Sequence, residues 1–209
     1  MNKKIKSLML GLLTLPLLVS CGSKEVTFAA FKEEALNAPE KNYTSATVEG
    51  SFTAENITTG EKTSVVLDSE YTFNSEENIW EVKEAKDESV AESMSEALST
   101  NLKTAFKDMS EEDEEQIPEF MKFYVGGGFE IKAIIKSAED LGLDALFGEG
   151  VKVTAKGEAS VKFDKYGHLV SGKANGSFSM ETLPGSEEVV EEQDNLSMKV
   201  EGSLKVTYK

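Results

Sequence analysis

The chain has 209 residues, and its 38 aspartates and glutamates outnumber 22 basic residues, all of them lysine, so the formal net charge at pH 7 is −16. An acidic body without arginine excludes the basic, guanidinium-rich surface that nucleic-acid binding requires. It also argues against docking on an anionic bilayer by charge, because like charges repel. One cysteine and one histidine cannot supply a disulfide, a thiolate metal cluster or a histidine-based zinc site.

The chain begins with a short apolar run behind a basic start. Lys3, Lys4 and Lys6 precede a leucine-rich stretch over residues 8–19, which is the order of a secretory signal peptide. This stretch is shorter than the roughly 20 apolar residues that a helix needs to span a bilayer core. We therefore predict a signal peptide over residues 1–20.

The tetrad that ends this segment, Leu18-Val19-Ser20-Cys21, resembles the lipobox of bacterial lipoproteins. The resemblance implies that Cys21 carries a diacylglyceryl thioether and that the chain is cut before it. Two acyl chains hold a protein durably on a membrane, whereas one does not. The alternatives are an ordinary signal peptide with an incidental cysteine, which the small residues beside Cys21 disfavour, and an uncleaved helical anchor, which the short length disfavours.

This interpretation divides the chain into three parts. After the signal peptide, residues 21–26 are the lipidated cysteine and a short tether, and residues 27–209 are a single domain. Residues 1–20 contain three lysines and no acid, so the remaining chain has a formal charge of −19. A chain of this size can bury one sizeable core.

Apolar spacing predicts helices and strands in the first half of the domain. Apolar residues at intervals of three and four predict a short helix over residues 28–38 and the longest helix over residues 87–109. Between these helices, alternation of apolar and polar residues predicts strands over residues 46–54, 65–73 and 79–82.

The second half is richer in strands. The acidic run at residues 111–115 lacks the ligand spacing of a calcium loop, so we interpret it as solvated charge. Further strands are expected on both sides of the Gly126-Gly127-Gly128 turn, and a short helix over residues 138–147. Three long alternating strands follow, over residues 151–163, 170–180 and 196–208, with an acidic loop before the last.

These elements predict an α+β domain with a large antiparallel β-sheet, which must twist or curl, and two or three helices. Their order behind a lipobox resembles that of the LolA-like and LppX-like bacterial lipoproteins. The segment at residues 163–169 is also similar to a hairpin of uncharacterised Gram-positive lipoproteins. The resemblance implies a curved sheet, an incomplete barrel, covered on one face by the helices, with acyl chains held between sheet and helices in some members.

Small residues occupy apolar-facing positions on two neighbouring strands. They leave room for a helix, for a lipid or for sharp curvature of the sheet. If the 87–109 helix is a lid, its apolar residues and the small residues line a ligand site; if it packs directly on the sheet, the same residues are core. The residues concerned are Met94, Leu98, Phe106, Gly157, Ala159, Gly172, Ala174 and Gly176.

No combination of nucleophile, base and orienting group is recognisable in the sequence. We interpret His168 as a surface residue. We therefore expect no enzymatic activity, no cofactor and no metal. The expected function is a structural or protein-interaction role at the cell envelope, as an extracytoplasmic lipoprotein anchored to the cell membrane through Cys21. The alternative is a binding or carrier module for a lipid or another apolar ligand. The partner is accordingly an envelope protein or a lipid.

Overall fold

The structure is a computed structural model, of which residues 23–142, 151–182 and 195–209 are described. The signal peptide, Cys21, the second half of the helix expected over residues 138–147 and nearly all of the acidic loop lie outside these residues. The elements, in chain order, are β1 (Lys24–Val26), α2 (Phe28–Leu36), β2 (Ser45–Asn56), β3 (Lys62–Asn74), β4 (Ile79–Ala85), α3 (Glu88–Ser99), α4 (Leu102–Lys107), α5 (Glu111–Glu115), β5 (Met121–Val125), β6 (Gly128–Ile135), the 3-10 helix η1 (Glu139–Leu141), β7 (Val151–Asp164), β8 (Leu169–Thr182) and β9 (Asn195–Tyr208).

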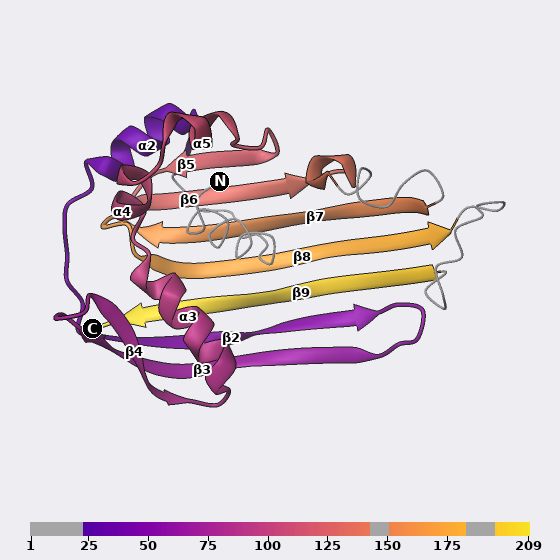
Figure 1. The fold of residues 1–209 in the computed structure, drawn as a ribbon, viewed down its shortest axis with the longest axis horizontal. Helices are drawn as coiled ribbons and strands as arrows, with labels where there is room; N and C mark the ends of the chain where they lie inside the picture. The colour runs from indigo at the N-terminus through magenta and orange to yellow at the C-terminus, as the bar shows by residue number, and fades with distance from the viewer. Residues whose placement is uncertain (1–22, 143–150, 183–194) are drawn as a thin grey trace.

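The strands form one antiparallel sheet of nine strands in the order β1-β5-β6-β7-β8-β9-β2-β3-β4. Two meanders, β5 to β9 and β2 to β4, join where the last strand pairs with β2, so that Val48 lies opposite Val206. The sheet is not closed, since β1 and β4 are its two edges (Figure 1). The predicted large antiparallel sheet is therefore confirmed, and it is open.

The sheet has one apolar and one polar face, as the alternation in the sequence predicted. Along β8 the residues at positions 171, 173, 175, 177, 179 and 181 are serine, lysine, asparagine or glutamate, while their neighbours are glycine, alanine, phenylalanine and methionine. The apolar face contributes Ala46, Val48, Leu204 and Val206 to the buried core.

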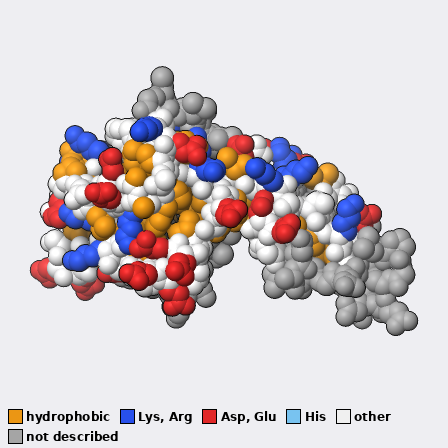
Figure 2. Space-filling view, turned by 90° about the horizontal axis from the view of Figure 1, so that it is seen from above, with side chains coloured by type: hydrophobic (Ala, Val, Ile, Leu, Met, Phe, Trp, Pro, Cys, Tyr) orange, Lys and Arg blue, Asp and Glu red, His pale blue; other side chains and the backbone are white. Residues whose placement is uncertain are grey.

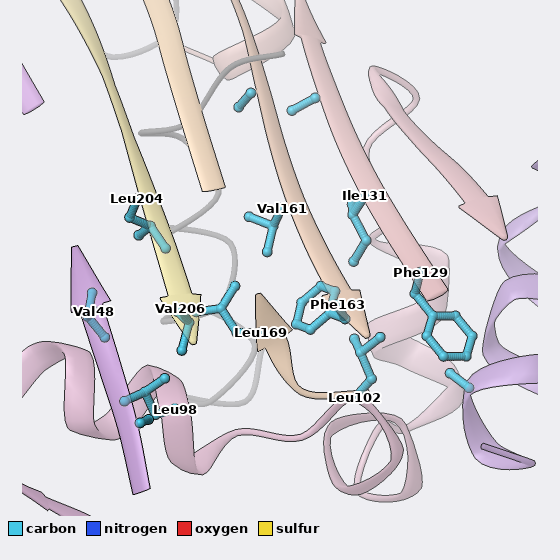
Figure 3. Packing of buried hydrophobic residues seen from close by; sticks show 14 of the residues in the cluster. Val48, Leu98, Leu102, Phe129, Ile131, Val161, Phe163, Leu169, Leu204 and Val206 are labelled. Atoms are coloured by element: carbon cyan, nitrogen blue, oxygen red, sulfur yellow. The ribbon is translucent and has the colours of Figure 1, made fainter. Parts of the chain in front are cut away.

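Helices α2, α3 and α4 add side chains to this same core, but only at one end of the sheet. In Figure 1 they gather over that end, while β7, β8, β9, β2 and β3 run on past them. Leu98 of α3 lies near Val48 and Val206 in Figure 3, and all three side chains are buried in one cluster. Phe31 of α2 is fully buried against the rings of Phe123 and other aromatic residues.

The single helix predicted over residues 87–109 is wrong, because the chain breaks at Asn101. Helix α3 ends at Ser99 with Thr100 as its C-cap, and Asn101 is the N-cap of α4. The side-chain oxygen of Asn101 accepts a hydrogen bond from Lys103 N at 2.9 Å, and its amide nitrogen donates to Tyr166 O at 2.9 Å. Leu102 N donates to Gly167 O at 3.0 Å. These bonds to the β7–β8 turn replace the helical continuation and hold α4 against the sheet.

Two segments expected to be irregular have regular structure. Residues 111–115 form helix α5, because Ser110 and Asp113 make a capping box and the acidic side chains suit the positive end of a helix. Glu114 of α5 forms an ion pair with Lys32 of α2. Lys24–Val26, placed in the tether by the sequence, pairs with β5 as the edge strand β1.

Glycines on the apolar face allow neighbouring backbones to approach closely. A Cβ atom on Gly202 would lie 2.4 Å from Ser51 O and 2.4 Å from Phe52 Cδ1, and one on Gly50 would lie 2.2 Å from Ser203 O. Real Cβ atoms do not come this close to other heavy atoms, so the strands β2 and β9 could not keep this path with any larger residue there.

We therefore predict that Gly202→Ala destabilises the domain by about 1–3 kcal/mol, the usual cost of overpacking. Ser203→Ala is the matched control, because Ser203 is the next residue on the exposed polar face and its replacement should cost less than about 0.5 kcal/mol. Urea unfolding of both variants measures the difference. Equal stabilities would show that the two strands can separate to admit a side chain.

Candidate functional site

The residues that the sequence proposed as a ligand lining on the helices lie within the packed core. Leu98 and Phe106 are 2% and 3% exposed, and Met94 packs against the same cluster. The ring of Phe106 meets those of Phe28 and Phe31 edge-on, at centroid distances of 5.7 and 5.8 Å. Protein side chains thus fill the space beneath α4.

The small residues proposed for the opposite wall lie side by side on the sheet. Ala159 faces Ala174, and Gly157 faces Gly176, across strands β7 and β8. Both alanines are buried, and a Cβ atom on Gly157 would lie 2.9 Å from Asn175 O and 2.9 Å from Gly176 Cα. Gly172, one register step beyond, is buried opposite Val161 and Leu204. The glycine pair therefore serves close approach of the two strands.

The apolar face itself continues beyond the helices, and there it stays partly open. The alternation along each strand and the pairing between strands place its side chains on the same face as Val48 and Leu204. Unlike those two, they are only half-buried, and Val65 is 37% exposed. Figure 2 shows this far half of the molecule as a thinner arm beside the block that carries the helices. We call this surface the open apolar face; it consists of Phe52, Ala54, Val65, Val153, Phe178, Met180, Leu196, Met198 and Val200.

The open apolar face is a continuous surface drawn from five strands. Phe178 of β8 lies opposite Met198 of β9, and Met180 lies opposite both Leu196 and Val153. The alternation in the sequence predicts that each of these residues lies on the apolar side of a strand, but it does not show that they form one site. The lengths of the elements could have indicated it, because strands of 14 residues extend beyond any helix that the structure describes.

The polar face carries a groove of about 470 Å³ lined by Glu49, Lys162, Val170, Ser171, Lys173, Ser203, Leu204, Lys205 and Val206. Lys162 also approaches Glu130, with Nζ 3.8 Å from its carboxylate. Glu49, Ser203 and Lys205 are exposed to solvent. Solvated charges of both signs bind small ligands weakly, so this groove is the lesser candidate.

A cluster of polar aromatic side chains closes the covered end of the sheet. The hydroxyl of Tyr43 donates to Asp164 Oδ2 at 2.7 Å, and its ring stacks on Tyr208 at 4.5 Å. His168 lies edge-on to Tyr43, and its Nε2 is 2.8 Å from Lys41 O, so this histidine is half-buried and not the surface residue that we expected.

Burial and the negative charge of Asp164 set the protonation of this cluster. Burial first, and then the hydrogen bond to Asp164, raises the pKa of Tyr43; burial followed by the charge of Asp164 raises that of Tyr208. Both phenols therefore remain neutral and cannot act as bases at neutral pH. The cluster connects the segment before β2 with the β7–β8 turn and with the end of β9. Its role is therefore structural.

The rest of the described chain adds no second type of site. Within residues 23–142, 151–182 and 195–209, no group of three His, Cys, Asp or Glu side chains is placed to hold a metal ion. No helix among these residues is both long and apolar enough to cross a membrane. Comparison with protein-family models, with curated proteins and with solved structures finds no match.

The two tyrosines of the cluster give a matched prediction. Tyr43→Phe removes a hydrogen bond to a carboxylate and should destabilise the domain by about 1–2 kcal/mol. Tyr208→Phe removes a buried hydroxyl that has no hydrogen-bond partner among the described residues, so stability should stay within about 0.5 kcal/mol or rise. Thermal melts at neutral pH compare the two. The reverse order would mean that Tyr208, and not Tyr43, anchors the cluster.

Proposed function

We propose that the protein is a membrane-anchored extracytoplasmic lipoprotein whose domain binds a partner protein of the cell envelope through the open apolar face. The observation that carries the proposal is the half-burial of large apolar side chains, such as Phe178 and Met198, on a face whose other half is a closed core. Monomeric domains rarely leave a broad contiguous apolar surface without a binding role.

The chemistry of this surface suits a protein partner. Phe52 and Phe178 offer rigid aromatic area, and Met180 and Met198 are flexible side chains that adapt to a partner's shape. The opposite, polar face stays solvated. In this proposal α2, α3 and α4 cover the near half of the apolar face and the bound partner covers the far half, which completes the covered sheet expected from the sequence.

The alternative is a carrier that holds a lipid between sheet and helices. The near half of the face gives this alternative little support, because Leu98, Phe106, Ala159 and Ala174 are packed against other side chains and are 2–4% exposed. A lipid would have to bind on the open apolar face instead, without a helix above it. The experiment below separates this outcome from protein binding.

The proposed anchor places the domain next to the membrane. Cys21 itself lies outside the described residues, and β1 begins at Lys24, so only Gly22 and Ser23 separate the two. The three residue steps from Cys21 to Lys24 span about 11 Å at most. With a formal charge of −19 the domain does not adhere to anionic lipid, so attachment depends on the acyl chains of Cys21. No feature of the chain suggests catalysis, and we propose a non-enzymatic role.

The open apolar face is tested by substitutions that keep the fold. Val200→Asp puts a charge on this face, where Val200 is half-buried, and should cost about 1 kcal/mol, whereas Val206→Asp, in the closed core at 4% exposed, should cost several. Lys199→Asp, one residue away on the polar face, is the matched control. In cells, a photo-crosslinking amino acid at position 178 should give one discrete protein adduct, which Val200→Asp abolishes and Lys199→Asp preserves.

Two outcomes would contradict protein binding at this face. The first is an adduct of equal yield from position 177, which lies on the polar face. The second is uptake of a fluorescent fatty acid by the purified protein that Val200→Asp abolishes, with no protein adduct from position 178. The second outcome would establish the carrier function in place of the interaction function.

The anchor is tested separately. Cys21→Ser removes the only thiol and therefore the acylation site. Metabolic labelling with an alkynyl fatty acid should mark the wild-type protein and not the variant, and the variant should remain an unprocessed precursor or be released from the membrane. Equal labelling of both proteins would rule out the lipoprotein assignment.

A further inference from the structure

We propose that two copies of this chain pair edge to edge through the free half of β3, Lys62–Leu67, and form a two-fold symmetric dimer with one continuous sheet. β3 pairs with β2 along one side over nearly its whole length, but β4 pairs only with Ser69–Asn74 on the other side. Next to that pairing, Lys86 N donates to Asp68 O at 3.0 Å. From Lys62 to Leu67, no other strand among the described residues lies on this side.

This free edge lacks the features that normally prevent strand addition. Proteins protect open edges with short strands, charged residues, prolines or bulges. The residues of the free half between Lys62 and Asp68 are Thr-Ser-Val-Val-Leu, without charge, proline or glycine. The bulge in β3 lies between Glu70 and Tyr71, where β4 already covers the edge.

The other edges of the sheet are protected. β1 is three residues long, and β4 presents Glu81, Lys83 and Glu84. β7 has no partner on its outer side before Gly157 among the described residues, and that stretch contains Lys152 and Lys156. Residues 63–67 of the free half of β3 are therefore the one uncharged stretch of open edge in the described sheet, and they are exposed at Val65 and Val66, which are 37% and 42% accessible.

The geometry of the edge fits a second copy of itself. In an antiparallel pair, residues directly opposite each other project from the same face. A two-fold axis perpendicular to the sheet keeps the apolar faces of both copies on one side. The axis must then lie midway between one residue and the same residue of the second copy, so that this residue is opposite itself. With the axis at Val65, Thr63 lies opposite Leu67 of the second copy, and Ser64 lies opposite Val66.

Neighbouring registers are less favourable. An axis at Val66 would set Thr63 opposite Ser69 and Lys62 opposite Glu70, and β4 already pairs with Ser69 and Glu70 on that side. An axis at Ser64 would set the carboxylate of Glu61 against Leu67 on the apolar face. The axis at Val65 avoids both conflicts, pairs all five uncharged residues and brings Lys62 of each copy near Asp68 of the other, which is a complementary charge at each end.

This pairing does not rest on the proposed partner binding, but the two are compatible. Val65 belongs to the open apolar face, so the dimer joins the two faces into one surface. The contact covers only a few residues, as in weak or transient interfaces. A membrane anchor would raise the effective concentration and favour association.

The axis is tested by single cysteines in the full-length chain, in the membranes of expressing cells. Opposed Cα atoms in an antiparallel pair are about 4.5–5.5 Å apart, which suits a disulfide. Val65→Cys should therefore form a disulfide-linked dimer under mild oxidation, several-fold above the wild-type background, which only precursor with a free Cys21 thiol can give. Ser64→Cys and Val66→Cys, each opposite a different residue, should stay near that background.

A second measurement covers the case in which oxidation is inefficient. Val65→Lys places like charges opposite each other on the axis and should weaken association by about fivefold or more, as measured by sedimentation of the full-length protein in detergent over a concentration series. Thr207→Lys, an exposed position on the inner strand β9, should leave association unchanged. Cross-linking that is strongest at position 64 or 66, or a wild-type chain that is monomeric throughout, would overturn the proposal.

Discussion

The length of the apolar face, compared with the helices available to cover it, governs this structure. Strands β7, β8 and β9 have 14 residues each, or about 46 Å at roughly 3.3 Å per residue. The longest helix among the described residues, α3, has 12 residues, about 18 Å at 1.5 Å per residue. Helices of this length can seal one end of such a sheet and no more. The closed core and the open apolar face are therefore two halves of one surface.

The covered end is held by contacts between residues far apart in the sequence. Asn101 joins the α3–α4 junction to the β7–β8 turn, Tyr43 binds Asp164 of the same turn, and Tyr208 of the last strand stacks on Tyr43. The segment before β2, the middle of the chain and its C-terminal strand thus meet at one place. Among the described residues, the far end of the sheet is held by strand pairing and by side-chain contacts such as Thr154 with Ser179, and no described helix covers its apolar side chains.

Local pattern predicted most of the elements, because the period of apolar residues depends on which face of each element is buried. The long strands, the glycine turn after β5 and the β7–β8 hairpin follow from that period alone. The break at Asn101 does not, because the apolar spacing runs through it, whereas the bonds of Asn101 and Leu102 to the β7–β8 turn come from residues far away in the sequence. Helix α5 could have been predicted from the capping box of Ser110 and Asp113, which the interpretation as solvated charge overlooked.

The order of the strands and the unpaired edge of β3 could not be predicted from the local pattern of apolar residues. The pairing of β9 with β2 decides that β1 and β4 are the edges, and the difference in length between β3 and β4 creates the free half of β3. Neither follows from residues close together in the sequence. The proposed lining meets a related limit: apolar spacing shows that Leu98 and Phe106 face inward, but not whether a cavity or another side chain lies next to them.

The order of the strands also constrains how an anchored dimer could be arranged. β1, which follows the proposed anchor directly, lies at one edge of the sheet, while the free half of β3 lies at the other side. Seven strand spacings of about 4.8 Å separate β1 from β3 by roughly 34 Å, so pairing through β3 puts the two anchors at opposite ends of the joined sheet. Both anchors can enter one bilayer when the two-fold axis is normal to the membrane. The joined sheet then lies along the membrane, and both open apolar faces point in the same direction, as a single partner would require.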